Sequence, residues 1–244
     1  MKILAVDTST MSGGIALLEN GNLCAEWTLR SARTHNRRLL KSIDRLLEET
    51  GWALASIDAF AVAAGPGSFT GLRIGMTTLK VLAWTMGKPY AAVSTLDALA
   101  LPLCFSAGLV CALLDARKDE VYCALYRPDA KGGLSLELPY SALSPSQLAA
   151  MLAARPAEPI IFCGDGWAPY GDFLKEKLGK LAIAPPSCFH IVRAACVGEL
   201  AARRFLRGES DDPVSSAPFY LRQSEAEINY PHFAERSSGK PEII

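Results

Sequence analysis

The sequence predicts an α/β protein with two similar domains, each built around a mixed β-sheet. The first reason is a repeated pattern: residues 3–21 (ILAVDTSTMSGGIALLENG) and 109–133 (LVCALLDARKDEVYCALYRPDAKGG) each give an apolar strand, an Asp, a polar turn and a second apolar strand. The second reason is that helices and strands alternate after the first hairpin, which is typical of a sheet that begins antiparallel and continues parallel. The third is composition, because half of the 244 residues are apolar and a fifth are charged, which is enough for sizeable cores.

The first domain is expected to continue from its hairpin with three helices and two strands. Apolar residues at helical spacing mark the first helix, which ends at Gly51. An Ala- and Val-rich run indicates a strand buried on both faces, and Gly65-Pro66-Gly67 turns the chain after it. Ser68 is placed to cap the long helix that follows. The expected elements are a helix over 34–50, a strand over 57–64, a helix over 68–86, a strand over 90–93 and a helix over 95–101.

The second domain is expected to follow the same plan after its hairpin. Its last helix has a strongly apolar face and is predicted to dock back on the first domain. From about Ser224 the composition becomes polar and rich in Ser, Gly and Pro, which indicates a loosely held tail. The expected helices cover 145–154, 173–178 and 191–206, with a strand over 160–163. The predicted domains are therefore residues 1–104 and 105–224, followed by the tail 225–244.

Charge and cysteine content narrow the class of protein. Lys plus Arg equals Asp plus Glu at 25 each, so bulk electrostatics do not favour nucleic-acid binding. The seven cysteines are scattered with no C-x-x-C pair, as expected for small buried side chains in a reducing compartment. No basic segment with a long apolar run precedes the first strand, and no run of 18 apolar residues occurs. These features predict a cytoplasmic protein with no membrane span.

The turn after the first strand is a candidate nucleotide site. Asp7 ends the strand and is followed by Thr8 and Ser9, so backbone N–H groups can hold phosphate oxygens while the carboxylate places a metal ion. Asp115 occupies the equivalent position in the second hairpin. The same residue types are also favoured in an ordinary β-turn, because their side chains bond to the local backbone. Both interpretations stay open at this stage.

The helix over 68–86 is associated with glycines four residues apart, at Gly67, Gly71 and Gly75. Two of them lie inside the helix, where each Gly costs about 1 kcal/mol relative to Ala. A close approach by another backbone would offset that cost, since the missing side chains leave a flat strip on one face. The other residues of this helix are apolar almost all round, so a second covering element is expected. Either the 34–50 helix or a partner subunit fits this role.

Four basic residues form a stripe at helical spacing on the first helix: Arg33, Arg37, Lys41 and Arg45. Such stripes are commonly solvated faces. No carboxylate interrupts the first half of this stripe, so it is also a candidate contact for phosphates or for an acidic partner.

Motifs for a complete active site are absent from the sequence. The three histidines, His35, His190 and His232, are too far apart for an H-x-x-x-H or H-E-x-x-H metal pair. No G-x-S-x-G nucleophile elbow is present, and no cysteine lies in a recognisable nucleophile motif. The sequence therefore predicts no catalytic residue and no metal ligand.

Four segments of the chain are distinctive in sequence: ILAVDTST, GPGSFTGLRIG, GKPYAAVSTLDALA and PFYLRQSEAE. Together they closely resemble the TsaB family, the partner proteins of bacterial threonylcarbamoyladenosine synthesis, and the resemblance covers the chain up to about residue 227. The GPGSFTGLRIG segment is the most specific of the four. The resemblance implies the actin-like ATPase (ribonuclease H-like) fold of the glycoprotease-like superfamily, in agreement with two duplicated domains.

The resemblance also implies a role in tRNA modification. Members of this family pair with their catalytic paralogue TsaD and, with the ATPase TsaE, move a threonylcarbamoyl group from an adenylate made by TsaC onto the adenosine beside the tRNA anticodon. The paralogue carries two metal-binding histidines where this sequence has Thr95 and Leu99, and neither side chain can replace imidazole. The implied protein is a non-catalytic subunit that stabilises and activates TsaD. It is expected to hold no cofactor by itself, and a nucleotide at the boundary of the complex is left open.

The resemblance places the partner surface on the first two helices. The implied contacts are His35, Leu39, Leu40 and Ile43 on the first helix and Gly71, Gly75, Met76 and Leu79 on the second. The isolated protein is expected to form a homodimer through the same surface. The basic stripe would flank this contact or touch tRNA.

The alternative hypothesis is an enzyme, an independent actin-fold ATPase or sugar kinase that uses Asp7 and Asp115. Binding of magnesium-ATP by the isolated chain discriminates between the two hypotheses.

Overall fold

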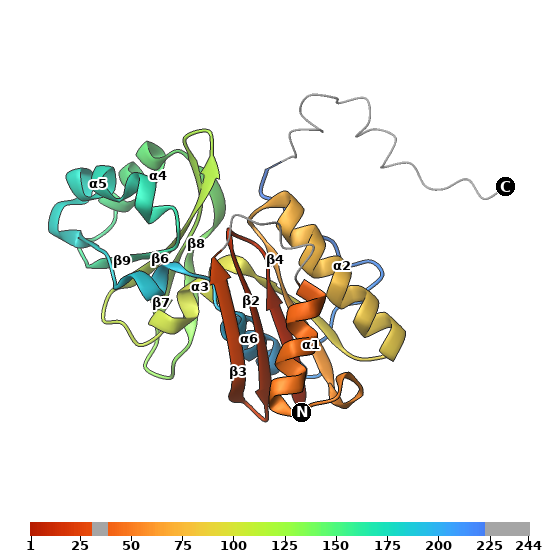
Figure 1. Cartoon of the computed structure of the whole chain (residues 1–244). Helices are drawn as coiled ribbons and strands as arrows, with labels where there is room; N and C mark the ends of the chain where they lie inside the picture. Colours follow the sequence, from red (N-terminus) through yellow and green to blue (C-terminus); the bar gives the residue numbers. More distant parts are fainter. Residues whose placement is uncertain (31–38, 223–244) are drawn as a thin grey trace.

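The computed structural model describes residues 1–30 and 39–222 (Figure 1). It consists of two lobes, each with a five-stranded mixed β-sheet at its centre. We use "first lobe" for the first sheet with the helices packed on it, and "second lobe" for the second sheet with its helices. The predicted start of the first helix at 34–38, with Arg33, His35 and Arg37, lies outside the described residues, as does the tail after residue 222.

The first sheet changes from antiparallel to parallel at its centre. Its strands are β1 (Lys2–Asp7), β2 (Ser12–Glu19), β3 (Asn22–Arg30), β4 (Ala59–Gly65) and β5 (Tyr90–Ser94). They lie in the order β3-β2-β1-β4-β5. β1 pairs antiparallel with β2 and parallel with β4, and β5 pairs parallel with β4.

The second sheet repeats this topology. Its strands are β6 (Leu109–Arg117), β7 (Glu120–Pro128), β8 (Leu134–Leu143), β9 (Ile160–Cys163) and β10 (Ala182–Ile183). They lie in the order β8-β7-β6-β9-β10, with β6 antiparallel to β7 and parallel to β9. The prediction of an α/β fold with two duplicated mixed sheets is confirmed.

The sequence did not predict β3, β8 or β10. β3 and β8 are edge strands with no fully buried residue, so neither shows the apolar pattern from which strands are recognised. β10 has two residues and pairs only with β9.

Helices cover both faces of the first sheet. α1 (Leu39–Thr50) and α2 (Phe69–Met86) pack on one face, and α3 (Thr95–Ala100) and α6 (Ala194–Leu206) on the other (Figure 1). Side chains of β1 alternate between the two cores, with Leu4 facing α1 and α2 and Ala5 facing α6. α6 lies far along the chain but packs closely on the first lobe, since a Cβ on Gly198 would overlap the side chain of Leu18.

The second lobe has helices on its outer face. They are α4 (Pro145–Ala153) and α5 (Trp167–Leu178), which share a core with β6 and β9. α5 begins six residues before the predicted start at 173. Pro169 lies in the first turn of α5, where a proline is tolerated because the N–H that it lacks has no partner within the helix. Short 3₁₀ helices are η2 (Leu54–Ser56), η3 (Leu101–Leu103), η4 (Gly179–Leu181) and η5 (Ser187–His190).

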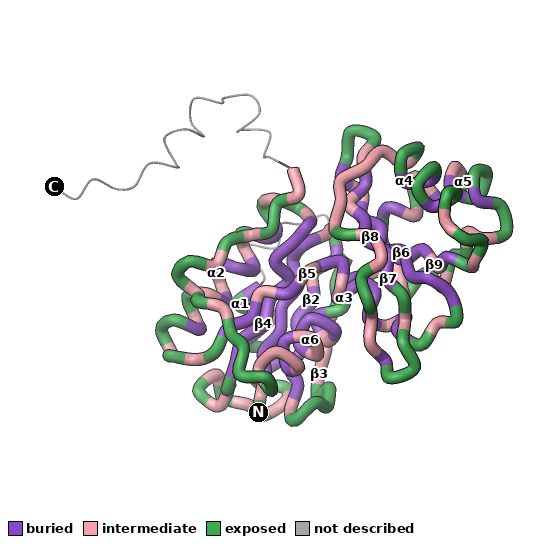
Figure 2. The backbone as a smooth tube through the Cα atoms, turned by 180° about the vertical axis from the view of Figure 1, so that it is seen from behind, coloured by how far each residue is buried: buried purple, intermediate pink, exposed green. Residues whose placement is uncertain are grey.

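Burial follows this layered arrangement. Figure 2 shows that buried residues are concentrated in the two sheets and that exposed residues lie in loops and on the outer helices. α3 lies between the lobes, in a core that contains residues of both sheets. In the part of the chain that the structure describes, no helix is long and apolar enough to cross a membrane.

Candidate functional site

The glycines of α2 pack against a turn of the same chain. A Cβ on Gly71 would overlap the carbonyl oxygen of Thr8, and a Cβ on Gly75 would overlap the Thr8 hydroxyl. The Thr8 hydroxyl donates to the Gly71 carbonyl at 2.7 Å. Just before α2, the Ser68 N–H donates to the Ser9 carbonyl at 2.7 Å. Close packing of the β1–β2 turn on the helix therefore explains why small residues are needed here.

The reason for predicting a partner contact at these glycines is therefore wrong. Of the predicted contact residues that the structure describes, Leu40 alone is largely exposed, at 58 %. The others pack on the first sheet or on the β1–β2 turn and are not accessible to a partner. They are Leu39, Ile43, Gly71, Gly75, Met76 and Leu79. His35 lies outside the described residues.

The opposite side of α2 carries a different stripe. Arg73, Thr77, Val81 and Trp84 recur at intervals of three or four residues and are all exposed. Trp84 is 69 % exposed and Val81 is 55 % exposed, which is informative because large apolar side chains are usually more buried. Leu40 belongs to α1, which covers the same face of the sheet (Figure 1). We call Leu40, Val81 and Trp84 the α1–α2 surface.

Asp7 is a buried carboxylate at the end of β1, with an exposed fraction of 0 %. Its Oδ1 accepts hydrogen bonds from the Ser9 N–H at 3.0 Å and from the Ser9 hydroxyl at 2.6 Å. Its Oδ2 has no hydrogen-bond partner among the described residues. Burial raises the pKa of Asp7 from 3.8 to about 6; the bonds from Ser9 oppose this rise and the charge of Asp165 adds to it.

Asp115, the predicted counterpart of Asp7, has other partners. Its carboxylate accepts the Arg117 N–H at 2.8 Å and pairs with the Arg117 guanidinium at 3.2 Å. Its own N–H donates to the carboxylate of Asp165 at 3.0 Å. Asp165 follows β9 and is the second-lobe carboxylate whose charge acts on Asp7, and the sequence analysis missed it. The available signal was a Gly-Asp-Gly turn directly after a predicted strand.

The described residues offer little for a metal or a phosphate. No group of three His, Cys, Asp or Glu side chains within residues 1–30 and 39–222 could hold a metal ion. Thr95 and Leu99, which the resemblance places where the paralogue has histidines, are buried on α3. Thr8 and Ser9 are buried beneath the start of α2, so a phosphate could reach this turn only if the helix moved.

The basic stripe is described only in its second half. Lys41 and Arg45 are exposed on α1. Arg45 pairs with Glu49 at 3.3 Å and lies over the ring of Trp27, with 5.5 Å between the guanidinium carbon and the ring centroid. A contact of this stripe with tRNA or with an acidic partner stays a prediction.

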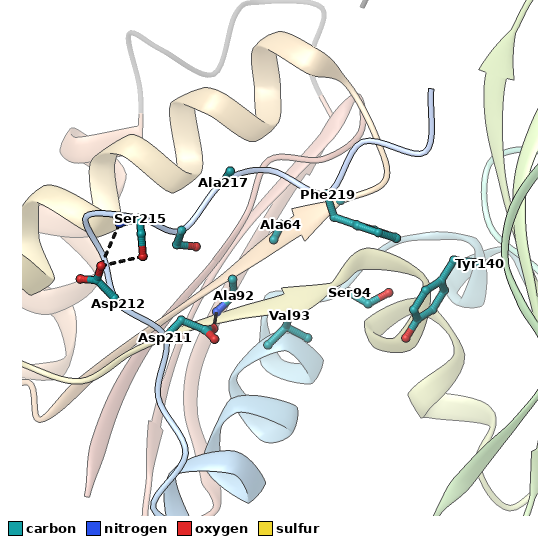
Figure 3. A pocket seen from close by; sticks show the side chains of 12 residues that line it. Ala64, Ala92, Val93, Ser94, Tyr140, Asp211, Asp212, Ser215, Ala217 and Phe219 are labelled. Carbon is teal, nitrogen blue, oxygen red and sulfur yellow. Dashed lines mark hydrogen bonds between the residues drawn. The ribbon is translucent and has the colours of Figure 1, made fainter. Parts of the chain in front are cut away.

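A cavity of about 410 Å³ lies between the lobes, at the carboxyl ends of β4 and β5 (Figure 3). Small residues of these strands, such as Ala64 and Ala92, form one side. Tyr140 of β8 forms another, and the segment from Asp211 to Phe219 closes a third. The carboxyl ends of parallel strands are common ligand positions. No sequence pattern indicates this cavity, because its walls come from segments that are distant in sequence.

Comparisons with known proteins give a consistent family. The model of a family described as TsaD, tRNA N6-adenosine threonylcarbamoyltransferase, matches residues 29–230. The chain is 32 % identical over 230 residues to the tRNA threonylcarbamoyladenosine biosynthesis protein TsaB of Bacillus subtilis (strain 168), a match that covers 94 % of this chain and 98 % of the relative. The protein of the same name from Escherichia coli (strain K12) is 32 % identical over 231 residues, which is 93 % of this chain and 96 % of the relative. A tRNA N6-adenosine threonylcarbamoyltransferase of Brucella ovis is 40 % identical over 79 residues, or 32 % of this chain and 22 % of the relative.

Comparison with solved structures supports the same family and fold. YeaZ from Pseudomonas aeruginosa is 33 % identical and superposes with a TM-score of 0.78, over 90 % of this chain and 99 % of that one. Component A of the (R)-2-hydroxyglutaryl-CoA dehydratase of Acidaminococcus fermentans is 10 % identical with a TM-score of 0.50, over 84 % of this chain and 98 % of that one, and it shows the fold alone. The actin-like ATPase fold that the resemblance implied is confirmed. Because the chain has this fold and is 32 % identical to two TsaB proteins over 93–94 % of its length, it belongs to the TsaB family.

Proposed function

We propose that this chain acts in the biosynthesis of threonylcarbamoyladenosine in tRNA, as a non-catalytic subunit that pairs with a TsaD-type transferase and activates it. In this proposal TsaE joins through the complex, TsaC supplies the adenylate, and tRNA is the substrate of the whole complex. The proposal is supported by similarity along almost the whole chain to proteins named for this biosynthesis, and by the shorter similarity to a threonylcarbamoyltransferase.

The observation that carries the pairing is the α1–α2 surface. Exposed apolar area costs free energy, about 25 cal/mol for each Å² that a partner would remove from water. Trp84 and Val81 lie one helical turn apart, so a helix of a partner can contact both at once. Two helices from each protein would then form a four-helix contact. In the isolated chain the same surface would pair with a second copy.

An ATPase or sugar kinase is the second candidate, and one observation favours it. Asp7 has a buried oxygen without a hydrogen-bond partner among the described residues, as an acidic group waiting for a cation would have. Against this candidate, Thr8 and Ser9 are covered by α2. Calorimetry with magnesium-ATP is expected to detect no binding by the isolated chain. Micromolar binding that disappears in Asp7→Ala would favour the enzyme.

Trp84→Glu is expected to weaken binding to a TsaD-type transferase by about 30-fold or more, because a buried aromatic anchor commonly contributes about 2 kcal/mol or more. The glutamate also places a charge where apolar area should be buried. Co-purification and titration calorimetry measure the loss, and sedimentation velocity measures the expected loss of the homodimer. A tRNA modification assay with each component omitted in turn tests the role in the pathway.

Leu206→Glu is the matched control. Leu206 is 82 % exposed at the end of α6, on the opposite face of the first sheet, so the same chemical change should leave binding unaltered. If Trp84→Glu binds the transferase as tightly as the unmodified chain, the α1–α2 surface is not the contact.

A further inference from the structure

We propose that the segment from Asp211 to Arg222 is a clasp: it holds the two lobes in one relative orientation and keeps the cavity between them closed on one side. The polypeptide crosses between the lobes twice, once between α3 and β6 and once between β10 and α6. Two crossings permit hinge rotation of one lobe against the other. The clasp adds a third, noncovalent connection.

The clasp begins on the first lobe, at the edge of β5. The Asp211 N–H donates to the Tyr90 carbonyl at 2.8 Å, and the Asp211 carboxylate accepts the Ala92 N–H at 2.7 Å. Arg204 of α6 binds both oxygens of this carboxylate, at 2.9 and 2.8 Å. A bidentate pair of this kind is specific in geometry, so the start of the clasp is fixed in place. Figure 3 shows Asp211 beside Ala92 at the edge of the cavity.

The clasp then runs along α2, from Lys80 in its second half back to Phe69 at its start. The Lys80 ammonium donates to the carbonyls of Val214 and Ser216. The Tyr220 ring stacks on Phe69, with 5.1 Å between centroids, and its hydroxyl accepts from Nε of Arg73 at 3.1 Å. These contacts tie a segment without helix or strand to a rigid helix along much of its length.

The backbone of the clasp also forms a hydrogen bond with the end of β4. The Phe219 N–H donates to the Ala64 carbonyl at 2.7 Å. Gly65 permits this approach, because a Cβ there would overlap the Phe219 carbonyl oxygen. The clasp therefore lies on the strand ends that form one side of the cavity.

Phe219 and Arg222 of the clasp contact the second lobe. The Phe219 ring meets Tyr140 of β8 edge to face, with 5.6 Å between centroids. Arg222 donates to the carboxylate of Glu120 on β7 at 2.8 Å. An aromatic pair and an ion pair each contribute modestly, but both must break before the lobes can separate at this side. The cavity has walls from both lobes, so its shape depends on these contacts.

Single-molecule energy transfer between the lobes tests the clasp. Dyes are attached at Thr85→Cys on α2 and Asp172→Cys on α5, both exposed, after Cys24 and Cys188 have been replaced by Ser. The remaining cysteines are buried and do not react readily. The otherwise unmodified chain is expected to give one narrow distance distribution. Phe219→Ala/Arg222→Ala is expected to give a broadened distribution or a second population.

Val214→Ala is the matched control, because the exposed side chain of Val214 takes part in neither the Phe219–Tyr140 contact nor the Arg222–Glu120 contact. This substitution should leave the distribution narrow. Circular dichroism checks that each variant is folded. Should Phe219→Ala/Arg222→Ala fail to fold, Phe219→Leu/Glu120→Gln removes the ring contact and the ion pair more gently. A folded variant of either kind with the same narrow distribution overturns the proposal, since α3 would then hold the lobes without the clasp.

Discussion

Gly71→Ala is expected to destabilise the folded chain by about 3 kcal/mol, although alanine is the best helix former. The added methyl group would overlap the carbonyl oxygen of Thr8, which is backbone and cannot rotate away. Relief requires the β1–β2 turn to move off α2, and this movement breaks the hydrogen bond from the Thr8 hydroxyl to Gly71. Because domains are commonly stable by about 5–15 kcal/mol, this loss is roughly a fifth to three fifths of the total free energy of unfolding. Urea unfolding followed by circular dichroism measures the change.

Gly87→Ala provides the matched comparison. Gly87 ends α2 with φ +62° and has no atom within 4 Å of the position that a Cβ would take. The same substitution there should cost about 1 kcal/mol, from backbone conformation alone. If Gly71→Ala is no more destabilising than Gly87→Ala, the β1–β2 turn does not pack closely against α2 at Gly71.

The two glycine positions show what a sequence can and cannot tell about packing. The spacing of Gly67, Gly71 and Gly75 correctly indicated that another backbone approaches this side of α2. It could not indicate which backbone, and both expected candidates, the first helix and a partner subunit, were wrong for the glycines. The covering element is the β1–β2 turn, about 60 residues earlier, at Thr8 and Ser9. Contacts between segments so distant in sequence leave no local periodicity to read.

Elements with a strong local pattern were predicted well. The predicted helix over 68–86 is α2 at Phe69–Met86, and the predicted strand over 160–163 is β9 at Ile160–Cys163. Both are bounded by turn residues: Gly65, Pro66 and Gly67 precede α2 and Gly87 follows it, while Pro159 precedes β9 and Gly164 follows it. Edge strand β3 was missed, because a half-exposed edge has no single buried face to impose alternation.

Asp7, Asp115 and Asp165 also show that the sequence indicates local features better than contacts between distant segments. Asp7 was identified from its place at the end of a strand, and it is indeed enclosed and unusual in its pKa. Its predicted counterpart Asp115 was chosen by the repeated hairpin, whereas the second-lobe carboxylate that adds to the raised pKa of Asp7, after the larger effect of burial, is Asp165. The repeat fixes equivalent positions within each lobe, but the approach of one lobe to the other depends on packing around α3 that no repeat encodes.

Asp7→Asn is expected to change how stability depends on pH. The folded chain holds a proton on Asp7 with a pKa of about 6, above its usual value of 3.8, so the folded state binds this proton more tightly than the unfolded state. The resulting stabilisation is fully present below about pH 4 and is lost as the pH rises through about 6. A shift of about two pKa units corresponds to roughly 3 kcal/mol. Asparagine does not titrate and lacks this dependence.

The measurement compares the two proteins at each pH and follows how the difference in their free energies of unfolding changes with pH. The free energy of unfolding is determined in urea from pH 4 to pH 8 for both proteins, and the stability of Asp7→Asn relative to the unmodified chain should rise by roughly 3 kcal/mol across this range. Other titrating groups are common to both proteins and largely cancel, and the cost of the unpaired asparagine N–H shifts the whole curve without changing its slope. Ser9→Ala removes the hydroxyl that donates to Asp7 Oδ1 at 2.6 Å and stabilises the ionised carboxylate. The pKa of Asp7 in the folded state should therefore rise, and the pH at which the stabilisation is lost should rise with it. A constant difference between Asp7→Asn and the unmodified chain at every pH would mean that the pKa of Asp7 is the same in the folded and unfolded states, and hence that a cation or water reaches the oxygen left without a partner.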